Sequence, residues 1–279
     1  MSFLQIIILA IVQGITEFLP ISSSGHLILL PLATSWPDQG IVTDVMVHVG
    51  SLFAVIVYFW RDVLRILQGM LDTATGKRTD NARLFLFIAV GTIPALIFGA
   101  ALKLSGFLDA IRANPLLLVQ IVGCNAIIYG LILYAADRWG PQIKRMESMT
   151  WRSAIIIGLA QALALIPGTS RSGVTISAAR FLGIERPDAA RYSFLLGIPA
   201  ISAAGLLTAL EAYQSGAGIP SDALLAALFT FFTALLAIAF LMALIRRMSF
   251  APFVLYRLVL GVGLLSIYMF WPDLLIAVT

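Results

Sequence analysis

The chain has 279 residues, of which 60% are hydrophobic and only 11% are charged, whereas an ordinary globular domain is about 25% charged. Together with a mean hydropathy of +0.99, this composition excludes a soluble domain. The net charge of +4 does not indicate a nucleic-acid partner, because the basic residues lie between apolar segments rather than on one polar face. The single cysteine, Cys124, excludes an internal disulfide and a cysteine metal cluster.

Eight apolar regions follow one another along the chain. A helix that crosses about 30 Å of hydrocarbon needs roughly 20 apolar residues. Six regions have that length: 41–60, 84–104, 114–136, 190–210, 223–245 and 251–272. The other two, 2–34 and 153–183, are interrupted near the middle by proline, glycine and serine. Because irregular backbone survives at membrane depth only where protein or water satisfies it, we predict an all-α integral membrane protein with six transmembrane helices and two re-entrant helical hairpins.

Positive charge predicts the orientation of these segments, because cytoplasmic loops of membrane proteins are rich in Lys and Arg. Fourteen of the 18 Lys and Arg lie in four connections on one side of the predicted topology, at 61–83, 137–152, 180–191 and 246–250. Only Lys103 and Arg112 lie on the opposite side. We therefore expect both termini and the turns around 35–40 and 211–222 to lie outside the cytoplasm.

The two interrupted regions have a common pattern. Residues 13–25 and 161–173 both begin with glutamine, end with glycine, and contain proline and a serine cluster. Three spans follow each region, so the second copy starts on the opposite face of the membrane. This pattern indicates an inverted-topology repeat, an arrangement found in transporters, with repeat 1 at about 1–136 and repeat 2 at about 151–272.

Ionisable side chains within apolar regions are costly and are therefore candidates for function. They are Glu17, His26, Asp44, His48, Arg171 and Arg257. Glu17 is the only acidic residue of the first interrupted region, and Arg171 lies inside the break of the second. If the two breaks face each other, these charges lower each other's burial cost. A purely structural ion pair is the alternative, although buried pairs often stabilise a protein little.

The second break has the features of an anion site. Serines and glycines at a helix break leave backbone N–H groups free at a helix N-terminus, where phosphate is favoured. The guanidinium of Arg171 suits phosphate oxygens, and Ser170, Ser172 and Thr175 add hydroxyl donors. Packing of small residues between helices would explain the serines and glycines, but it would not explain why Arg171 lies in this break.

The first break combines an acid, a hydroxyl and an imidazole. Gln13 and Glu17 are four residues apart and share a helical face, while Ser23 and His26 are three residues apart. Such groups together can form an activated nucleophile, although their order matches no soluble hydrolase motif. From spacing alone, catalysis and substrate coordination both stay open.

Three further ionisable residues receive weaker assignments. Asp44 and His48 are four residues apart at the start of a span, a spacing that could hold a metal. A helix end that keeps both groups wet is the simpler explanation. We expect Arg257, six residues into the last span, to extend its charged head to the cytoplasmic surface, outside the site.

Two segments closely resemble the signature motifs of the undecaprenyl-diphosphate phosphatase family, the bacitracin-resistance type of integral membrane phosphatase in bacteria. The first runs from Gln13 to His26 and reads QGITEFLPISSSGH. The second runs from Pro167 to Thr175 and reads PGTSRSGVT. The similarity extends over the whole chain and includes Gly50-Ser51 and, before the last span, Phe250-Ala251-Pro252-Phe253 with Tyr256-Arg257.

This resemblance implies hydrolysis of undecaprenyl diphosphate to the monophosphate carrier of cell-wall synthesis, at a site open to the outer face of the bacterial cytoplasmic membrane. It implies that Glu17 is the essential acid, Ser23 the candidate nucleophile and His26 the histidine of the motif, and that Arg171 belongs with Ser170, Ser172 and Thr175 to the string that binds the diphosphate. We assign His26 as a catalytic acid or base and Arg171 as a catalytic residue. Further substrate contacts are expected from Gln13, Ser22, Ser24, Gly168, Thr169, Ser170, Ser172, Gly173 and Thr175.

The first motif of the family often carries glutamate where this chain has Gln13. Because an amide oxygen can also ligate Mg²⁺ or Ca²⁺, we expect a divalent cation held by Glu17, Gln13 and substrate phosphate oxygens. The alternative function is a transporter or flippase of a prenyl phosphate lipid, since inverted repeats with broken helices are common in transporters. Beyond the lipid substrate and membrane lipids, the sequence leaves a homodimer open.

Overall fold

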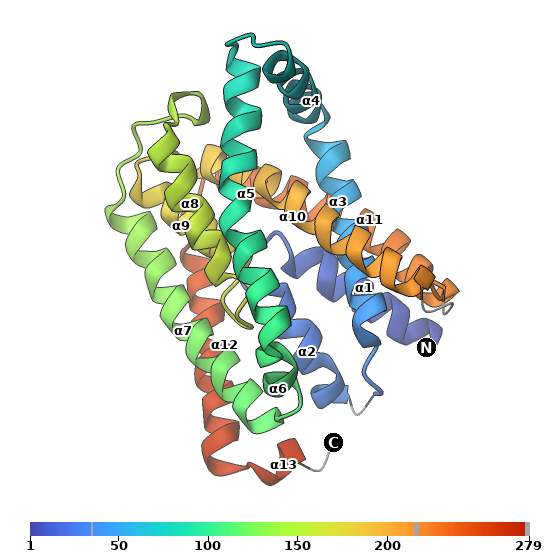
Figure 1. Ribbon diagram of the computed structural model, residues 1–279. Coiled ribbons are helices and arrows are strands. Elements are labelled where there is room, and N and C mark those ends of the chain that lie inside the picture. The colour runs from blue at the N-terminus through green and yellow to red at the C-terminus, as the bar shows by residue number, and fades with distance from the viewer. Residues whose placement is uncertain (35, 215–217, 277–279) are drawn as a thin grey trace.

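The computed structural model describes residues 1–34, 36–214 and 218–276, and its regular structure is helical (Figure 1). The elements are α1 (Phe3–Thr16), α2 (Ser23–Thr34), α3 (Gly40–Tyr58), α4 (Trp60–Ala74), α5 (Asp80–Ser105), α6 (Phe107–Arg112), α7 (Pro115–Trp139), η1 (Met146–Ser148), α8 (Trp151–Leu163), α9 (Arg171–Phe181), α10 (Arg186–Gln214), α11 (Ser221–Leu244), α12 (Ala251–Phe270) and α13 (Asp273–Ile276). Within the described ranges, extended structure is limited to one bridge between Lys144 and Ile184.

Six helices are long and apolar enough to cross a membrane, namely α3, α5, α7, α10, α11 and α12. They coincide with the six predicted spans. Several reach beyond the predicted limits, and α5 and α10 extend to 26 and 29 residues. The predicted all-α class with six membrane-length helices is therefore confirmed. Ser35 and residues 215–217, which belong to the two turns predicted outside the cytoplasm, lie outside the described residues.

Each interrupted region forms two short helices joined by irregular backbone. α1 and α2 flank the first break, and α8 and α9 flank the second. The residue before the second helix is in both cases a serine with positive φ, 77° at Ser22 and 73° at Ser170, a conformation that is uncommon for any residue but glycine. Their hydroxyls accept hydrogen bonds from the N–H groups of Gly25 (3.4 Å) and Gly173 (3.1 Å), as helix N-caps do. Re-entry into the membrane stays a prediction.

Helices at the same position in the two proposed repeats have equivalent packing partners. α1 packs against α11, and α8, which has the same place in the second repeat, packs against α5. α3 packs against α10 and α7 against α12, so in these pairs each helix contacts its own counterpart. Two copies of one unit in opposite orientations would form such pairs. The boundaries at 1–136 and 151–272 stay a prediction.

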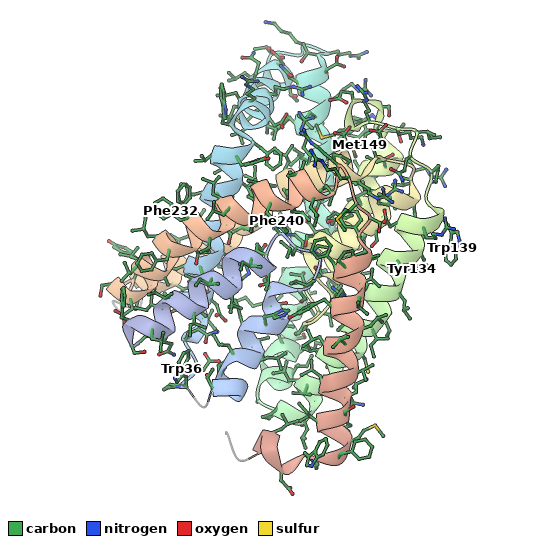
Figure 2. All side chains as sticks on the ribbon, turned by 180° about the vertical axis from the view of Figure 1, so that it is seen from behind. Trp36, Tyr134, Trp139, Met149, Phe232 and Phe240 are labelled. Atoms are coloured by element: carbon green, nitrogen blue, oxygen red, sulfur yellow. The ribbon has the colours of Figure 1, made fainter. Side chains whose placement is uncertain are left out.

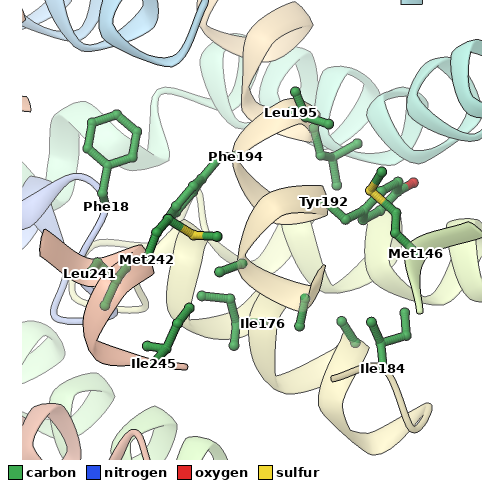
Figure 3. Close-up of a cluster of buried hydrophobic side chains, with 14 of the residues drawn as sticks. Phe18, Met146, Ile176, Ile184, Tyr192, Phe194, Leu195, Leu241, Met242 and Ile245 are labelled. Carbon is green, nitrogen blue, oxygen red and sulfur yellow. The ribbon is translucent and has the colours of Figure 1, made fainter. Parts of the chain in front are cut away.

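The largest hydrophobic cluster links the first break to α10 (Figure 3). Phe18 and Phe194 are fully buried, and their rings meet edge to face at 5.2 Å between centroids. Edge-to-face aromatic pairs contribute about 0.5 to 1.5 kcal/mol beyond their burial. This contact holds the backbone of the first break against α10. Nearby members of the cluster are Ile176, Leu241 and Met242.

The outer faces of the spans carry large apolar side chains. Phe232, Leu236 and Phe240 lie four residues apart on one face of α11 and are all more than half exposed. Figure 2 shows Phe232 and Phe240 on the ribbon of α11. Exposed apolar residues in such number fit contact with lipid.

Two glycines allow α5 and α8 to cross closely. A Cβ at Gly158 would lie 2.7 Å from the Cα of Gly91, too close for both backbones to keep their places. Gly263 of α12 offers the opposite case, because nothing lies within 4 Å of a Cβ added there.

We predict that Gly158→Ala lowers the thermal midpoint of the purified protein, since overpacking a tight contact costs about 1 to 3 kcal/mol. Gly263→Ala is the matched control, and it should leave the midpoint unchanged or raise it, because alanine favours a helix by about 1 kcal/mol. Equal midpoints for the two variants would show that the crossing of α5 and α8 is not tight.

Candidate functional site

Glu17 is the centre of a buried polar cluster that both breaks build together. Its side chain is only 5% exposed. Oε1 accepts a hydrogen bond from Nη2 of Arg171 at 2.9 Å, and Oε2 accepts one from the hydroxyl of Ser23 at 2.6 Å. Nε2 of Gln13 donates to Oε2 at 3.1 Å. The expected meeting of carboxylate and guanidinium is confirmed, and Ser23 folds back onto the acid six residues before it.

Arg171 is held in place by α10 as well as by Glu17. Its Nη1 donates to the carbonyl oxygen of Ser193 at 2.8 Å. A Cβ at position 197 would lie 2.7 Å from Cζ of Arg171, so only glycine leaves room for the guanidinium beside α10. At 15% exposure, Arg171 keeps some access from outside. Its guanidinium is thus fixed at two points, and its side chain is not fully buried.

His48 joins this cluster, which the sequence analysis did not predict. Its Nε2 lies 3.5 Å from Oε2 of Glu17. Its Nδ1 lies 2.7 Å from the carbonyl oxygen of Asp44, and since a carbonyl only accepts, Nδ1 carries the proton. The side chain of Asp44 instead accepts from Nε2 of Gln39 at 2.7 Å. Asp44 therefore orients His48 through its backbone, and within the described part of the chain no three His, Cys, Asp or Glu side chains gather as metal ligands.

Within the described residues, the polar contacts of His26 are with Ser22 and Tyr256 rather than with Glu17. Its Nδ1 lies 2.7 Å from the carbonyl oxygen of Ser22, and its Nε2 lies 2.6 Å from the hydroxyl of Tyr256 on α12. The His26 and Tyr256 rings also stack, at 5.7 Å between centroids. The described contacts of His26 thus position the start of α2 against α12, and an acid or base role for it stays a prediction.

Most of the hydroxyls predicted to bind substrate are engaged by other protein groups, and the exception is Thr169, whose buried Oγ1 has no hydrogen-bond partner among the described residues. Ser22 and Ser24 contact each other at 3.4 Å, as do Ser170 and Ser172 at 3.3 Å. Thr175 contacts the hydroxyl of Ser193 at 2.6 Å. Gly168 adopts a positive φ of 83° in the second break, and Gly173 donates its N–H to Ser170. These bonds shape the breaks, and direct contacts with substrate stay predictions.

Arg257 does not reach the cytoplasmic surface, and that expectation was wrong. It is 1% exposed and donates to five carbonyl oxygens. Nη1 bonds Pro20 of the first break at 3.3 Å, and Nη2 bonds Gly168 and Thr169 of the second at 3.0 and 3.2 Å. Bonds to Asn125 and Ala126 of α7 complete the set. The physical reason is that broken helices leave carbonyls without intrahelical partners, and one fork satisfies both breaks.

Three buried polar atoms have no hydrogen-bond partner within the described residues: Oε1 of Gln13, Oε1 of Gln161 and Oγ1 of Thr169. The amide of Gln13 cannot be reversed, because its nitrogen must face the carboxylate of Glu17. An unpaired buried acceptor costs roughly 1 to 3 kcal/mol. Next to a carboxylate, the free oxygen of Gln13 suits a hard cation such as Mg²⁺ or Ca²⁺, so the residues present fit the expected ion.

Several contributors to the cluster carry little signal in the sequence. His48 stands among the intramembrane ionisable residues, but nothing in the chain shows that it faces Glu17. Ser51, whose hydroxyl lies 3.4 Å from Nε2 of Gln13, and Tyr256 belong to segments of family resemblance. Ser193 has no such signal, because serine is common in membrane helices as a packing residue.

The cluster contains a carboxylate that accepts a hydrogen bond from a hydroxyl group. A guanidinium lies beside the same carboxylate. Such a set can deprotonate a hydroxyl and stabilise negative charge on phosphate oxygens. Phosphoryl transfer depends mainly on positioning and charge stabilisation, and both are present here.

Comparison with known proteins gives consistent matches. Residues 6–263 match the family model described as bacitracin resistance protein BacA. The chain is 48% identical over 286 residues to an undecaprenyl-diphosphatase of Erythrobacter litoralis, covering 96% of this chain and 100% of that protein. It is 49% identical over 269 residues to an undecaprenyl-diphosphatase of Ruegeria pomeroyi, covering 96% and 99%. Undecaprenyl-diphosphatase 1 of Rhodospirillum rubrum is 46% identical over 281 residues, covering 98% of each.

We predict that Arg257→Lys lowers the thermal midpoint strongly. Lysine has only three donors on one nitrogen, so at least two of the five carbonyls lose their partner, at roughly 1 to 3 kcal/mol each. The matched control is Arg247→Lys, since Arg247 is exposed. If both variants unfold at the wild-type temperature, Arg257 does not hold the breaks together.

Proposed function

The chain belongs to the bacitracin resistance protein BacA family, and we propose that it hydrolyses undecaprenyl diphosphate to undecaprenyl phosphate and inorganic phosphate. The observation that carries this proposal is the contact of one carboxylate, Glu17, with both a hydroxyl and a guanidinium. The relatives named undecaprenyl-diphosphatase support the same substrate. The reaction regenerates a lipid carrier for cell-wall synthesis, which accords with the link of the family to bacitracin resistance.

Arg171 binds the diphosphate in this proposal. Its planar fork can contact two phosphate oxygens at once, and its bond to the carbonyl of Ser193 keeps the fork in place. Free N–H groups at the start of α9 and α2 add positive potential near the same point. Charge that develops on the phosphate oxygens is therefore stabilised by groups that are already oriented.

Ser23 attacks the terminal phosphorus, and Glu17 takes the hydroxyl proton across their 2.6 Å contact. A bond forms between Oγ and phosphorus while the bond from phosphorus to the bridging oxygen breaks, and undecaprenyl phosphate leaves with that oxygen and its electron pair. Water then attacks the phosphoserine, which releases inorganic phosphate and restores the hydroxyl. Because the leaving group is itself a phosphate, no strong general acid is needed.

A divalent cation, Mg²⁺ or Ca²⁺, is part of the proposal. The buried, unpaired Oε1 of Gln13 and the adjacent carboxylate of Glu17 would hold it together with phosphate oxygens of the substrate. When bound, it would supply positive charge to the diphosphate. Glu17 would then share its two oxygens between Arg171, Ser23 and the ion.

The setting of this activity is the bacterial cytoplasmic membrane. Six apolar helices make the chain a multi-pass membrane protein. We infer from the distribution of Lys and Arg that both termini lie outside, and from the family resemblance that the site opens to the outer face. The names of the relatives favour hydrolysis over the alternative, a transporter or flippase built on the same inverted repeat.

We predict that the purified protein releases inorganic phosphate from undecaprenyl diphosphate in detergent, which a transporter would not do.

Arg171→Lys should reduce turnover by about 10³-fold, because lysine keeps the charge but loses the bidentate fork. Arg246→Lys, at an exposed position, is the control. If the wild type releases no phosphate, the proposed phosphatase activity is wrong. If a folded Arg171→Lys variant keeps near wild-type turnover, Arg171 is not the residue that binds the diphosphate.

A second prediction distinguishes attack by Ser23 from attack by water. If Ser23 and Glu17 act as one unit, Ser23→Ala and Glu17→Gln each abolish most turnover, and the double variant is little worse than either. If water attacks, Ser23→Ala loses only a positioning bond, about 1 to 3 kcal/mol, and the effects add. Phosphate release by the three variants decides between the two routes, and additivity removes Ser23 from the role of nucleophile.

A further inference from the structure

Helix α4 has its polar side turned toward the protein and its apolar side turned away. The inward residues include Asp62, Gly69 and Asp72, all buried. The outward residues Trp60, Leu64, Leu67 and Leu71 are 48 to 57% exposed. At 3.6 residues per turn, these four form one narrow stripe on the side of the helix opposite to the buried residues. A helix on an aqueous surface would have the reverse arrangement.

The inward side of α4 is fixed by ionic and hydrogen bonds. Asp62 accepts from Nε of Arg191 on α10 at 2.8 Å, and also from Nη2 of the same residue. Asp72 accepts from the hydroxyl of Thr79 at 2.6 Å and from Nε2 of Gln68 at 3.0 Å. The helix is therefore held in one orientation, and the exposure of its leucines is built into the fold.

The apolar stripe continues the lipid-facing side of a membrane span. On α3, Phe53 and Val57 are 55% and 48% exposed. Trp60 and Leu64 follow at the same helical intervals, with only Phe59 between the two helices. In Figure 1, α4 lies beside the end of α5 at the upper end of the molecule. The stripe therefore begins directly after the exposed apolar residues at the end of α3.

The exposed charges around the stripe are mainly basic, and the exposed acid Asp80 at the start of α5 is paired with Arg83. Arg61 at the start of α4, and Lys77 and Arg78 just after its end, are exposed, whereas both acids of α4 are buried. The guanidinium of Arg61 lies over the ring of Trp60, 5.2 Å from its centroid. Aromatic and basic residues together are typical of the boundary between lipid and water, and basic residues near an anionic leaflet are attracted to its surface.

We propose that α4 is a lipid-binding surface that lies in the headgroup layer of the membrane side predicted as cytoplasmic and engages anionic phospholipids. The leucines and Trp60 enter the boundary between headgroups and acyl chains, as amphipathic interfacial helices do. Arg61, Lys77 and Arg78 contact lipid phosphates at the two ends of the stripe. This surface lies apart from Glu17 and does not depend on the proposed hydrolysis.

The test uses the full chain with Cys124→Ala, which removes its only cysteine, reconstituted in vesicles. A nitroxide label is attached at Leu67→Cys, and a second version carries it at Leu64→Cys in case the first fails to fold. Electron paramagnetic resonance then compares access of oxygen, which concentrates in lipid, with access of a water-soluble nickel complex. Labels at Leu236→Cys on α11 and Ser148→Cys on η1 give the lipid and water references, since both positions are exposed.

We expect the label on α4 to favour oxygen over nickel, at a depth between the two references. Vesicles of phosphatidylcholine with phosphatidylglycerol should place it deeper than phosphatidylcholine alone, and Lys77→Gln with Arg78→Gln should remove that difference. A label as accessible to nickel as the one at Ser148, or one shielded from both reagents as under a second protein, overturns the lipid-binding surface. Equal depth in both vesicles overturns the preference for anionic lipid.

Discussion

The carbonyl groups of two broken helices need donors inside a protein that has little water to offer them. Arg257 provides these donors, since its one guanidinium contacts Pro20 in the first break and Gly168 and Thr169 in the second. The same group bonds two carbonyls of α7. Both breaks are thus fixed to one point of α12. The common attachment brings together the two breaks that carry Glu17 and Arg171, and α10 also holds Arg171 through Ser193.

The second constraint is charge. Glu17 and Arg171 come from opposite breaks and neutralise each other, so neither remains an isolated buried ion, which would be far more costly than a pair. The carboxylate has two oxygens and divides them, one toward Arg171 and one toward Ser23. In the proposed mechanism, a diphosphate bound at Arg171 brings its own negative charge and shares the guanidinium with Glu17. The other oxygen of the carboxylate stays hydrogen-bonded to the hydroxyl of Ser23, which it would deprotonate in that mechanism.

Much of the fold follows from the sequence because length and composition determine it. A run of about 20 apolar residues has few alternatives to a span. The two runs in which proline stands beside a serine cluster are interrupted there, whereas α5 and α10 each keep one proline inside a continuous helix. The pairing of Glu17 with Arg171 could be predicted because intramembrane charges are rare. The contact of His48 with Glu17 could not be predicted, because the position of a residue within a helix does not show which side chain of another helix it faces.

Arg257 and α4 show where sequence reasoning reaches its limit. The sequence around an arginine six residues into a span looks the same whether the side chain extends to the membrane surface or turns into the protein. Arg257 turns inward because the two breaks pack against α12 and present carbonyl oxygens to it. In α4 the polar residues face the protein, because Arg191 of α10 attracts Asp62 inward. Averaged over its length the segment is neither apolar nor polar, so its residues suggested a charged connection rather than a helix.

The position of Arg257 in the sixth of the six spans has a consequence for biogenesis. The first break leaves the ribosome early, but its donor on α12 is synthesised more than 200 residues later. Until α12 enters the bilayer, the carbonyls of Pro20, Gly168 and Thr169 must be satisfied by water or by the insertion machinery. The two halves therefore cannot mature one after the other as independent units. The bonds that hold both breaks to α12 therefore form only after the last span has been synthesised.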